Sequence, residues 1–213
     1  MKLLICILFL VGLLHSISAK AQGTTFFSNL GPVGNVTDVA SDCWRAASFV
    51  TGTDTGGYQL NSIQLKMSSS VGSPSGFAVR LYSASGVLPG ETLGDLVGLS
   101  PQTGGVYTYG TSSLSLSPAT KYFIVLTSET TLASGSFQWS VGISSEFSAS
   151  NGWFTDGSYL QSPNGLNWSG YRPNPFQFAI DATAVPEPST LALFCFSSLT
   201  VGALLFRRAK VKT

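Results

Sequence analysis

The chain has 213 residues, of which 44% are hydrophobic and only 10% are charged, and its formal net charge is +1. That length suits one folded domain that buries a core of its own. The charge is unevenly placed, because the segment 22–188 holds five basic and ten acidic residues, a net charge of −5. A sparsely charged, mildly acidic domain is unsuited to phosphate backbones, so we expect no nucleic-acid partner.

The first 21 residues have the three parts of a secretory signal peptide. Lys2 supplies the positive start, residues 3–14 form the apolar core of a signal helix, and Ala19 and Ala21 fit the small-residue pattern before a cleavage site. The apolar core is too short for a membrane-spanning helix. We therefore predict export through the general secretory translocon, cleavage by signal peptidase and a mature start at Gln22.

Residues 22–184 are predicted to form one domain of short strands. Several segments alternate apolar and polar side chains, which is typical of strands with one buried face and one solvated face. Residues 122–126 are continuously apolar, which predicts a central strand covered on both faces. The segment Leu-Pro-Gly-Glu-Thr at 88–92 is predicted to be a turn. The alternating apolar sets are Ile63, Leu65 and Met67; Phe77, Val79 and Leu81; Phe137, Trp139, Val141 and Ile143; and Phe176, Phe178 and Ile180.

No stretch of the domain keeps a helical period, and clusters of Gly, Pro, Asn and Ser recur at the spacing of strand turns. We therefore expect an all-β fold, an antiparallel β-sandwich of about eight to ten strands. The pattern leaves a jelly-roll topology and an immunoglobulin-like topology both open. The sandwich would be flanked by an N-terminal signal helix and a C-terminal transmembrane helix.

A series of short segments gives the domain a family resemblance. The segments, in order, are Ala47-Ser48-Phe49-Val50-Thr51-Gly52, residues 60–65, Val79-Arg80-Leu81-Tyr82-Ser83, Leu88-Pro89-Gly90, residues 116–122 and Phe178-Ala179-Ile180. On these segments the chain resembles the choice-of-anchor R group of bacterial surface domains over most of 46–183. The resemblance implies a β-rich surface domain that stands before different C-terminal anchors, and it supplies no catalytic residues.

Histidine and cysteine are almost absent from the predicted mature domain. The single histidine, His15, lies in the signal peptide, which removes Ser-His and Cys-His nucleophile pairs and histidine metal sites. Cys43 is the only cysteine of the domain, because Cys6 and Cys195 lie in the terminal segments. No internal disulfide can form, so Cys43 is a buried thiol beside Trp44, a reactive thiol or one half of an intermolecular crosslink.

Carboxylates offer the one remaining route to catalysis, because a glycan hydrolase needs two acids that face each other across a cleft. No metal site or cofactor is otherwise expected, although Asp54 and Asp156 lie in Gly-rich turns that could help to bind a structural calcium ion. The default interpretation of these acids is solvated loop residues. The candidate acids are Asp54, Glu91, Asp95, Glu129, Glu146 and Asp156.

Aromatic residues in the Gly-rich region 151–171 suggest a lectin-like alternative. Apolar ring faces stack on the C–H faces of sugars, while amide side chains orient hydroxyl groups. Trp153, Tyr159, Asn167 and Trp168 could form such a glycan-binding platform on loops. The competing interpretation is that these rings pack into the core or close loops.

The last 29 residues, 185–213, form a three-part tail. The two prolines of its motif cannot donate ladder hydrogen bonds and hold the chain extended. The apolar run that follows is near the short end of the length that crosses a bilayer, and the basic end should stay cytoplasmic. The parts are the motif Pro186, Glu187 and Pro188 with Ser189, the transmembrane span 190–206, and the tail 207–213, which begins with the membrane stop Arg207 and Arg208.

This tail resembles the PEP-CTERM sorting signal of bacterial exported proteins. The resemblance implies recognition by an exosortase, a membrane cysteine transpeptidase, with cleavage near the motif. An ordinary C-terminal anchor after a proline linker is the alternative. We expect a non-enzymatic protein, anchored first in the inner membrane and then displayed at the cell surface or in the extracellular matrix. Its expected role is structural or adhesive, with exopolysaccharide as a possible partner; a lectin-like glycan-binding module and a carboxylate-dependent glycan hydrolase are the alternatives.

Overall fold

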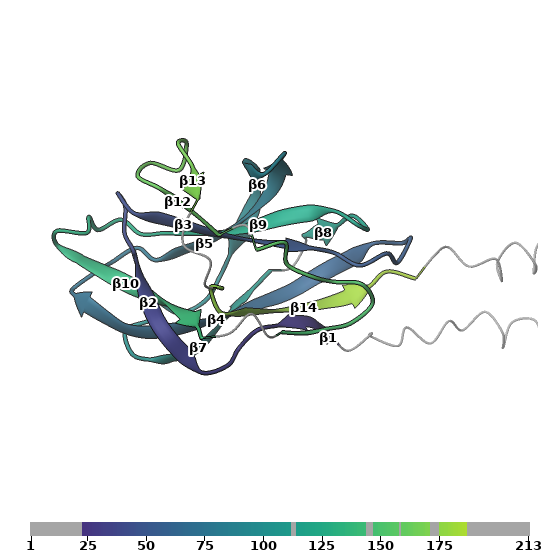
Figure 1. Ribbon diagram of the computed structural model, residues 1–213, viewed down its shortest axis with the longest axis horizontal. Helices are drawn as coiled ribbons and strands as arrows, with labels where there is room; N and C mark the ends of the chain where they lie inside the picture. The colour runs from purple at the N-terminus through teal and green to yellow at the C-terminus, as the bar shows by residue number, and fades with distance from the viewer. Residues whose placement is uncertain (1–22, 112–113, 144–146, 158, 171–174, 187–213) are drawn as a thin grey trace, which may run out of the picture.

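The computed structural model describes residues 23–111, 114–143, 147–157, 159–170 and 175–186. These residues form fourteen strands and no helix, arranged as two antiparallel sheets that stack on one another (Figure 1). The predicted all-β fold with two antiparallel sheets is confirmed. The predicted number of strands is wrong, partly because three strands have only two residues each. The predicted signal helix and transmembrane span lie outside the described residues.

The larger sheet is organised by one long central strand. Its members are β1 (Thr24–Ser28), β2 (Val33–Val39), β4 (Tyr58–Gly72), β7 (Gly105–Gly110), β8 (Ser115–Leu116), β10 (Gly135–Gly142), β11 (Ser148–Ala149) and β14 (Phe178–Ala184). One edge of β4 pairs with β14 near its start and with β10 near its end. The other edge pairs with β8 and β7. Because β4 has 15 residues, it can align both neighbours on one side in a single sheet.

The smaller sheet has the order β13-β12-β3-β9-β5-β6. Its strands are β3 (Trp44–Val50), β5 (Ala78–Ser85), β6 (Leu88–Leu96), β9 (Lys121–Thr127), β12 (Tyr159–Ser162) and β13 (Ser169–Gly170). The predicted central strand is confirmed, because β9 lies between β3 and β5. Alternate residues of β9 point to opposite faces, and Ile124 enters the main core while Phe123 is buried in a second cluster with Tyr82 and Leu160.

The main core lies between the sheets and contains the predicted apolar faces. Ile63, Leu65 and all three aromatic or aliphatic members of the 176–180 set are fully buried. Each such side chain contributes roughly 1.5–3 kcal/mol to stability relative to an exposed one. Two residues depart from the prediction: β10 ends at Gly142 and Ile143 is 67% exposed beyond it, and Phe77 lies before β5 and is only partly buried.

The segment 88–92 was predicted to be a turn, and this is wrong. It is the first half of β6, which pairs only with β5 and is an edge strand. Proline is tolerated at an edge because one side of the strand needs no ladder donor. The pairing of β5 with β6 shifts register twice, so the hairpin is irregular.

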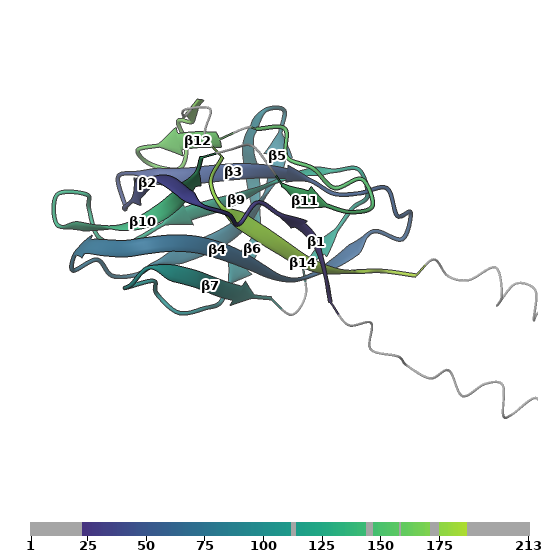
Figure 2. The ribbon, with the colours of Figure 1, turned by 60° about the horizontal axis from the view of Figure 1, so that its bottom comes forward.

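The N-terminal and C-terminal ends of the domain lie at the same end of the molecule. The first strand β1 runs antiparallel to the last strand β14, and Thr24 pairs with Ala182. The start of β1 and the end of β14 therefore lie at one end of the molecule (Figure 2). The last strand ends at Ala184. The part of the chain that the structure describes has no helix that is both long and apolar enough to cross a membrane.

Candidate functional site

The predicted glycan platform on residues 153–168 does not form as an exposed surface. Trp153 is only 2% exposed. Its ring stacks between Phe26 and Phe49, with centroid distances of 5.2 and 5.8 Å, and meets Tyr58 edge-on at 4.9 Å. Tyr159 is 5% exposed and also belongs to the main core. Both rings belong to the main core; Tyr159 is on β12, and the segment that carries Trp153 is held by backbone hydrogen bonds between Val50 and Phe154.

The other two platform residues lie elsewhere. Trp168 is half-buried against the second cluster, and its Nε1 donates a hydrogen bond to the carbonyl oxygen of Gly165 at 3.1 Å. Asn167 is exposed, and its backbone N–H donates to Oδ1 of Asn164 at 3.0 Å. These bonds close a loop. The structure therefore does not bring the four predicted residues together.

Two of the candidate acids are engaged in ion pairs on the smaller sheet. Asp95 accepts a hydrogen bond from Nε of Arg80 at 3.0 Å. Asp156 lies 2.6 Å from Nζ of Lys121, and it also accepts a hydrogen bond from Ser48. The Asp95 side chain is 73% exposed but lies on strand β6, whereas the Asp156 side chain is 35% exposed.

The remaining candidate acids are dispersed. Asp54 lies in the loop before β4, whereas Glu129 bonds through its backbone to the carbonyl oxygen of Ser75, beyond the opposite end of β4. Glu91 lies on β6, and Glu146 is outside the described residues. Among the residues that the structure describes, no group of three or more His, Cys, Asp or Glu side chains could hold a metal ion. Calcium binding by Asp54 or Asp156 stays a prediction.

Cys43 is half-buried at the turn between β2 and β3. Its Sγ lies 3.7 Å from the carbonyl oxygen of Asp38. Burial raises the pKa of the thiol above its usual value, and the carboxylates of Asp38 and Asp42 add to this effect against the opposing charge of Arg45. The thiol is therefore held protonated at neutral pH, which favours the packing role over the reactive one.

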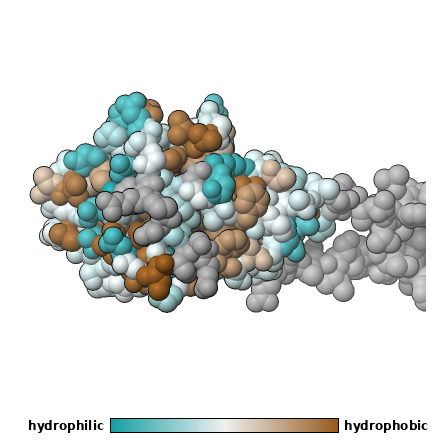
Figure 3. Space-filling view, in the orientation of Figure 1, coloured by the Kyte–Doolittle hydropathy of each residue, from teal (hydrophilic) through white to brown (hydrophobic). Residues whose placement is uncertain are grey.

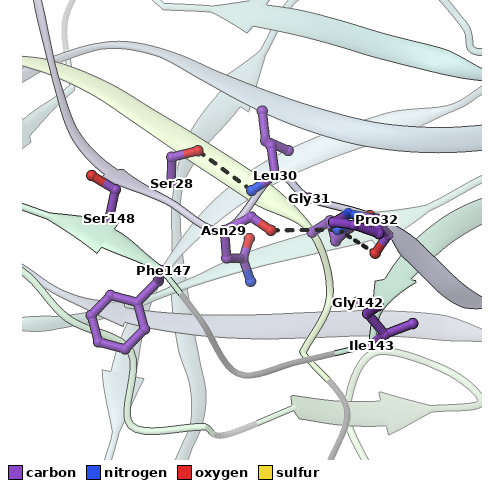
Figure 4. Close-up of a pocket in the computed structure, with 10 residues that line it drawn as sticks. Ser28, Asn29, Leu30, Gly31, Pro32, Gly142, Ile143, Phe147 and Ser148 are labelled. Carbon is purple, nitrogen blue, oxygen red and sulfur yellow. Dashed lines mark hydrogen bonds between the residues drawn. The ribbon is translucent and has the colours of Figure 1, made fainter.

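A pocket of about 350 Å³ opens beside β1 and β14 (Figure 4). In the close-up, Phe147 lies on one side, Pro32, Gly142 and Ile143 lie on the other, and Asn29 lies between them. The lining comes from four parts of the chain: residues 28–32 at the end of β1 and in the turn after it, residues 142–143 at the end of β10, Phe147 and Ser148 around the start of β11, and Gln177 before β14.

Two buried amide side chains fix the rear wall of this pocket. Asn29 donates from Nδ2 to the carbonyl oxygen of Phe176 at 2.8 Å, and its Oδ1 accepts from the backbone N–H of Phe178 at 2.7 Å. The side chain thereby continues the β1–β14 ladder past Ser28. Gln177 is 1% exposed and donates from Nε2 to the carbonyl oxygens of Asn29 and Pro32. The turn 29–32 is therefore held in place before any ligand arrives.

Phe147 forms the exposed apolar wall. Its ring stacks on Phe27 with a centroid distance of 5.5 Å and an interplanar angle of 28°. Phe27 is fully buried, whereas Phe147 is 48% exposed. Contact with Phe27 orients the ring, and about half of its surface remains open to a ligand.

The polar groups of the pocket are hydroxyls and backbone groups. Ser28 and Ser148 face each other as paired residues of β1 and β11. The Ser28 oxygen accepts a hydrogen bond from the N–H of Leu30 at 3.4 Å, which leaves its own proton to donate. Among the residues described here as lining, none carries an ionisable side chain. The described lining residues include no acid–base pair, and their groups suit binding of a neutral polar ligand.

A second hollow, of about 280 Å³, adjoins the first and shares Asn29 and Phe147 with it. Thr155, Asp156 and Tyr159 line its far side. Burial raises the pKa of the Tyr159 hydroxyl, with Asp156 adding to the rise against a hydrogen bond from Thr155, so the phenol stays neutral at physiological pH. Phe147 thus stands between two adjacent hollows.

Sequence reasoning missed this pocket. Phe147 falls outside every alternating set, and the turn Asn29-Leu30-Gly31-Pro32 carries no chemical motif. An isolated aromatic residue between turn-forming segments is the only signal that could have drawn attention to it. Of the predicted sorting residues, Pro186 is described and exposed. Ala19, Ala21, Glu187, Pro188, Ser189, Arg207 and Arg208 lie outside the described residues.

Comparison of the chain with protein-family models, curated proteins and solved structures finds no match. The class of protein that the fold defines is a two-sheet antiparallel β-protein with a neutral surface pocket.

Proposed function

We propose that this protein is exported, is held in the membrane by its C-terminal tail, and is then processed by an exosortase for display. Its role is non-enzymatic and is structural or adhesive at the cell surface or within an exopolysaccharide matrix. The predicted signal peptide and the PEP-CTERM-like tail supply the route and the destination.

One observation carries the proposal. The core side chains of the described residues run from Phe26 to Ala182, and β14 ends at Ala184, directly before the tail. Cleavage of the signal peptide or of the tail would therefore remove none of the core residues that the structure describes. Because both ends of the domain lie at one end of the molecule, a C-terminal tail can anchor it in the membrane while the rest of its surface stays accessible.

The neutral pocket supports a binding role over an enzymatic one. Glycoside hydrolysis needs a pair of acids on either side of the scissile bond. Asp54 and Glu129 lie near opposite ends of β4, and Asp95 and Asp156 are paired with basic side chains. These placements favour solvated acids over a catalytic pair.

The test is mass spectrometry of the C-terminus of the protein isolated from cells with and without an active exosortase. We expect a terminus near Pro188 only in the first case, and loss of that product in a Glu187→Ala variant. Glu91→Ala, which removes an acid from β6, serves as the matched control and should be processed normally. A chain that still ends at Thr213 in the presence of the enzyme would reject processing and leave only anchoring.

A further inference from the structure

We propose that the pocket between Phe147 and the turn 29–32 binds one neutral sugar unit of a polysaccharide. This inference rests on the proposed adhesive role, because it names the surface and the ligand class through which that role would act. The site differs from the platform predicted at residues 153–168, whose two central rings are buried.

The size of the pocket limits the ligand. Small-molecule sites usually range from about 300 to 1,000 Å³. At about 350 Å³, this pocket holds a ligand of the size of a single sugar ring, and the rest of a chain would extend over the surface. The adjoining hollow, beyond Phe147, gives a neighbouring unit a place to lie.

The walls match the two kinds of surface that a sugar ring presents. A pyranose has apolar C–H faces and a rim of hydroxyl groups. Phe147 offers a half-exposed ring face that Phe27 holds in position, while the cross-strand partners Ser28 and Ser148 add hydroxyls to the lining. A preorganised site spends less binding free energy on ordering its own side chains.

Charge selects neutral sugars over uronic acids or sulfated sugars. The described lining has no basic side chain that could pair with an anionic group. Lys66 is not among the lining residues that the structure describes, and one of its three ammonium N–H groups donates to the carbonyl oxygen of Gly31. The net charge of −5 over residues 22–188 further disfavours anionic polymers.

The form of the surface favours a glycan over a protein partner. Protein interfaces usually need a continuous buried patch of hundreds of Å² with an apolar centre. Figure 3 shows the exposed apolar side chains of the face in view as separate patches with polar surface between them. A small pocket with one exposed ring is instead typical of a site for one small polar unit.

The experiment measures binding of the full-length chain, purified in detergent, to three neutral polysaccharides (dextran, amylopectin and galactomannan) and to anionic alginate. We expect at least one neutral polysaccharide to bind. Phe147→Ala should then weaken binding about tenfold, since stacking supplies an interaction of that order. Phe154→Ala is the matched control, because Phe154 is 44% exposed and does not line the pocket; it should change binding less than twofold.

A second pair of variants covers the case in which Phe147→Ala fails to fold. Ser148→Tyr would fill the pocket from an exposed position on β11 and should abolish binding. Ala149→Tyr places the same side chain at the next residue, which is also exposed but does not line the pocket, and binding should persist. Circular dichroism of each variant confirms folding.

Three results would overturn the proposal. They are binding to no neutral polysaccharide, binding to alginate alone, and equal binding losses in the pocket variants and their controls. The assay uses the unprocessed chain, so it is independent of the exosortase. Failure of C-terminal processing would therefore leave the binding result standing, and failure of binding would leave the sorting proposal standing.

Discussion

Replacing Trp153 by alanine should destabilise the domain severely and so distinguishes a core residue from a ligand platform. The ring is 2% exposed and contacts Phe26, Phe49 and Tyr58 at centroid distances of 4.9–5.8 Å. Truncation removes the buried indole and leaves a cavity among three aromatic neighbours that cannot all collapse into it. Substitutions of this kind cost about 3–5 kcal/mol.

That loss is large against the total stability of a single domain, about 5–15 kcal/mol. For a domain of this size it corresponds to a fall in melting temperature of roughly 6–20 °C. The assay is urea unfolding followed by circular dichroism, on protein that ends at Pro186. The matched control is Trp168→Ala, because Trp168 is only half-buried; its loss should stay near about 1–2 kcal/mol.

The reasoning would be refuted if Trp153→Ala lowered the free energy of unfolding by less than about 1 kcal/mol, since truncation of a buried Trp packed against aromatic rings costs more than that. An unchanged stability combined with lost glycan binding would restore Trp153 to the surface role that the sequence suggested. Equal losses of stability in Trp153→Ala and Trp168→Ala would show that the stacking of Trp153 adds nothing to the stability of the domain.

Two further predictions concern the reactivity of Cys43 and the stability of a Gly57 variant. Cys43 should react with iodoacetamide more slowly than a free thiol at pH 8, because burial raises the pKa of the Cys43 thiol, and the reaction rate should keep rising above pH 9. Mass spectrometry of the peptide that contains Cys43 gives the rate. A rate at pH 8 equal to that of a free thiol would contradict the burial. Gly57→Ala should cost about 2–3 kcal/mol in urea unfolding, because φ is +74° and the new Cβ would lie 2.6 Å from the carbonyl oxygen of Leu116. Gly86→Ala is its control, with φ of +62° and no atom within 4 Å, and should cost only about 1 kcal/mol; equal costs would show that the contact with Leu116 is harmless.

Strands with a strong local signal were predictable from the sequence. The continuous apolar run at 122–126 is the central strand β9, and the alternation of Ile63, Leu65 and Met67 lies on β4. In both cases the side-chain pattern alone reports the number of buried faces. β6 was missed because Pro89 and Gly90 have the chemistry of a turn, and only the position of the strand at a sheet edge makes them acceptable there.

The candidate site could not be predicted from the sequence for a different reason. Burial of Trp153 depends on Phe26 and Phe49, which are far from it along the chain and reach it only when the sheets stack. The pocket likewise depends on turn 29–32 and Phe147, which are far apart in the sequence, meeting as lining residues. Local periodicity holds no information on such contacts, so an exposed ring and a buried one look alike in the sequence.

The position of β14 has a mechanical consequence. β14 lies between β1 and β4 and ends at Ala184, where the tail begins. Tension transmitted through the tail would pull along the axis of an interior strand, perpendicular to the ladder hydrogen bonds on both of its sides. Those bonds would be loaded together in shear instead of being opened one by one, so the domain should resist drag at its point of attachment better than it would if an edge strand carried the tether.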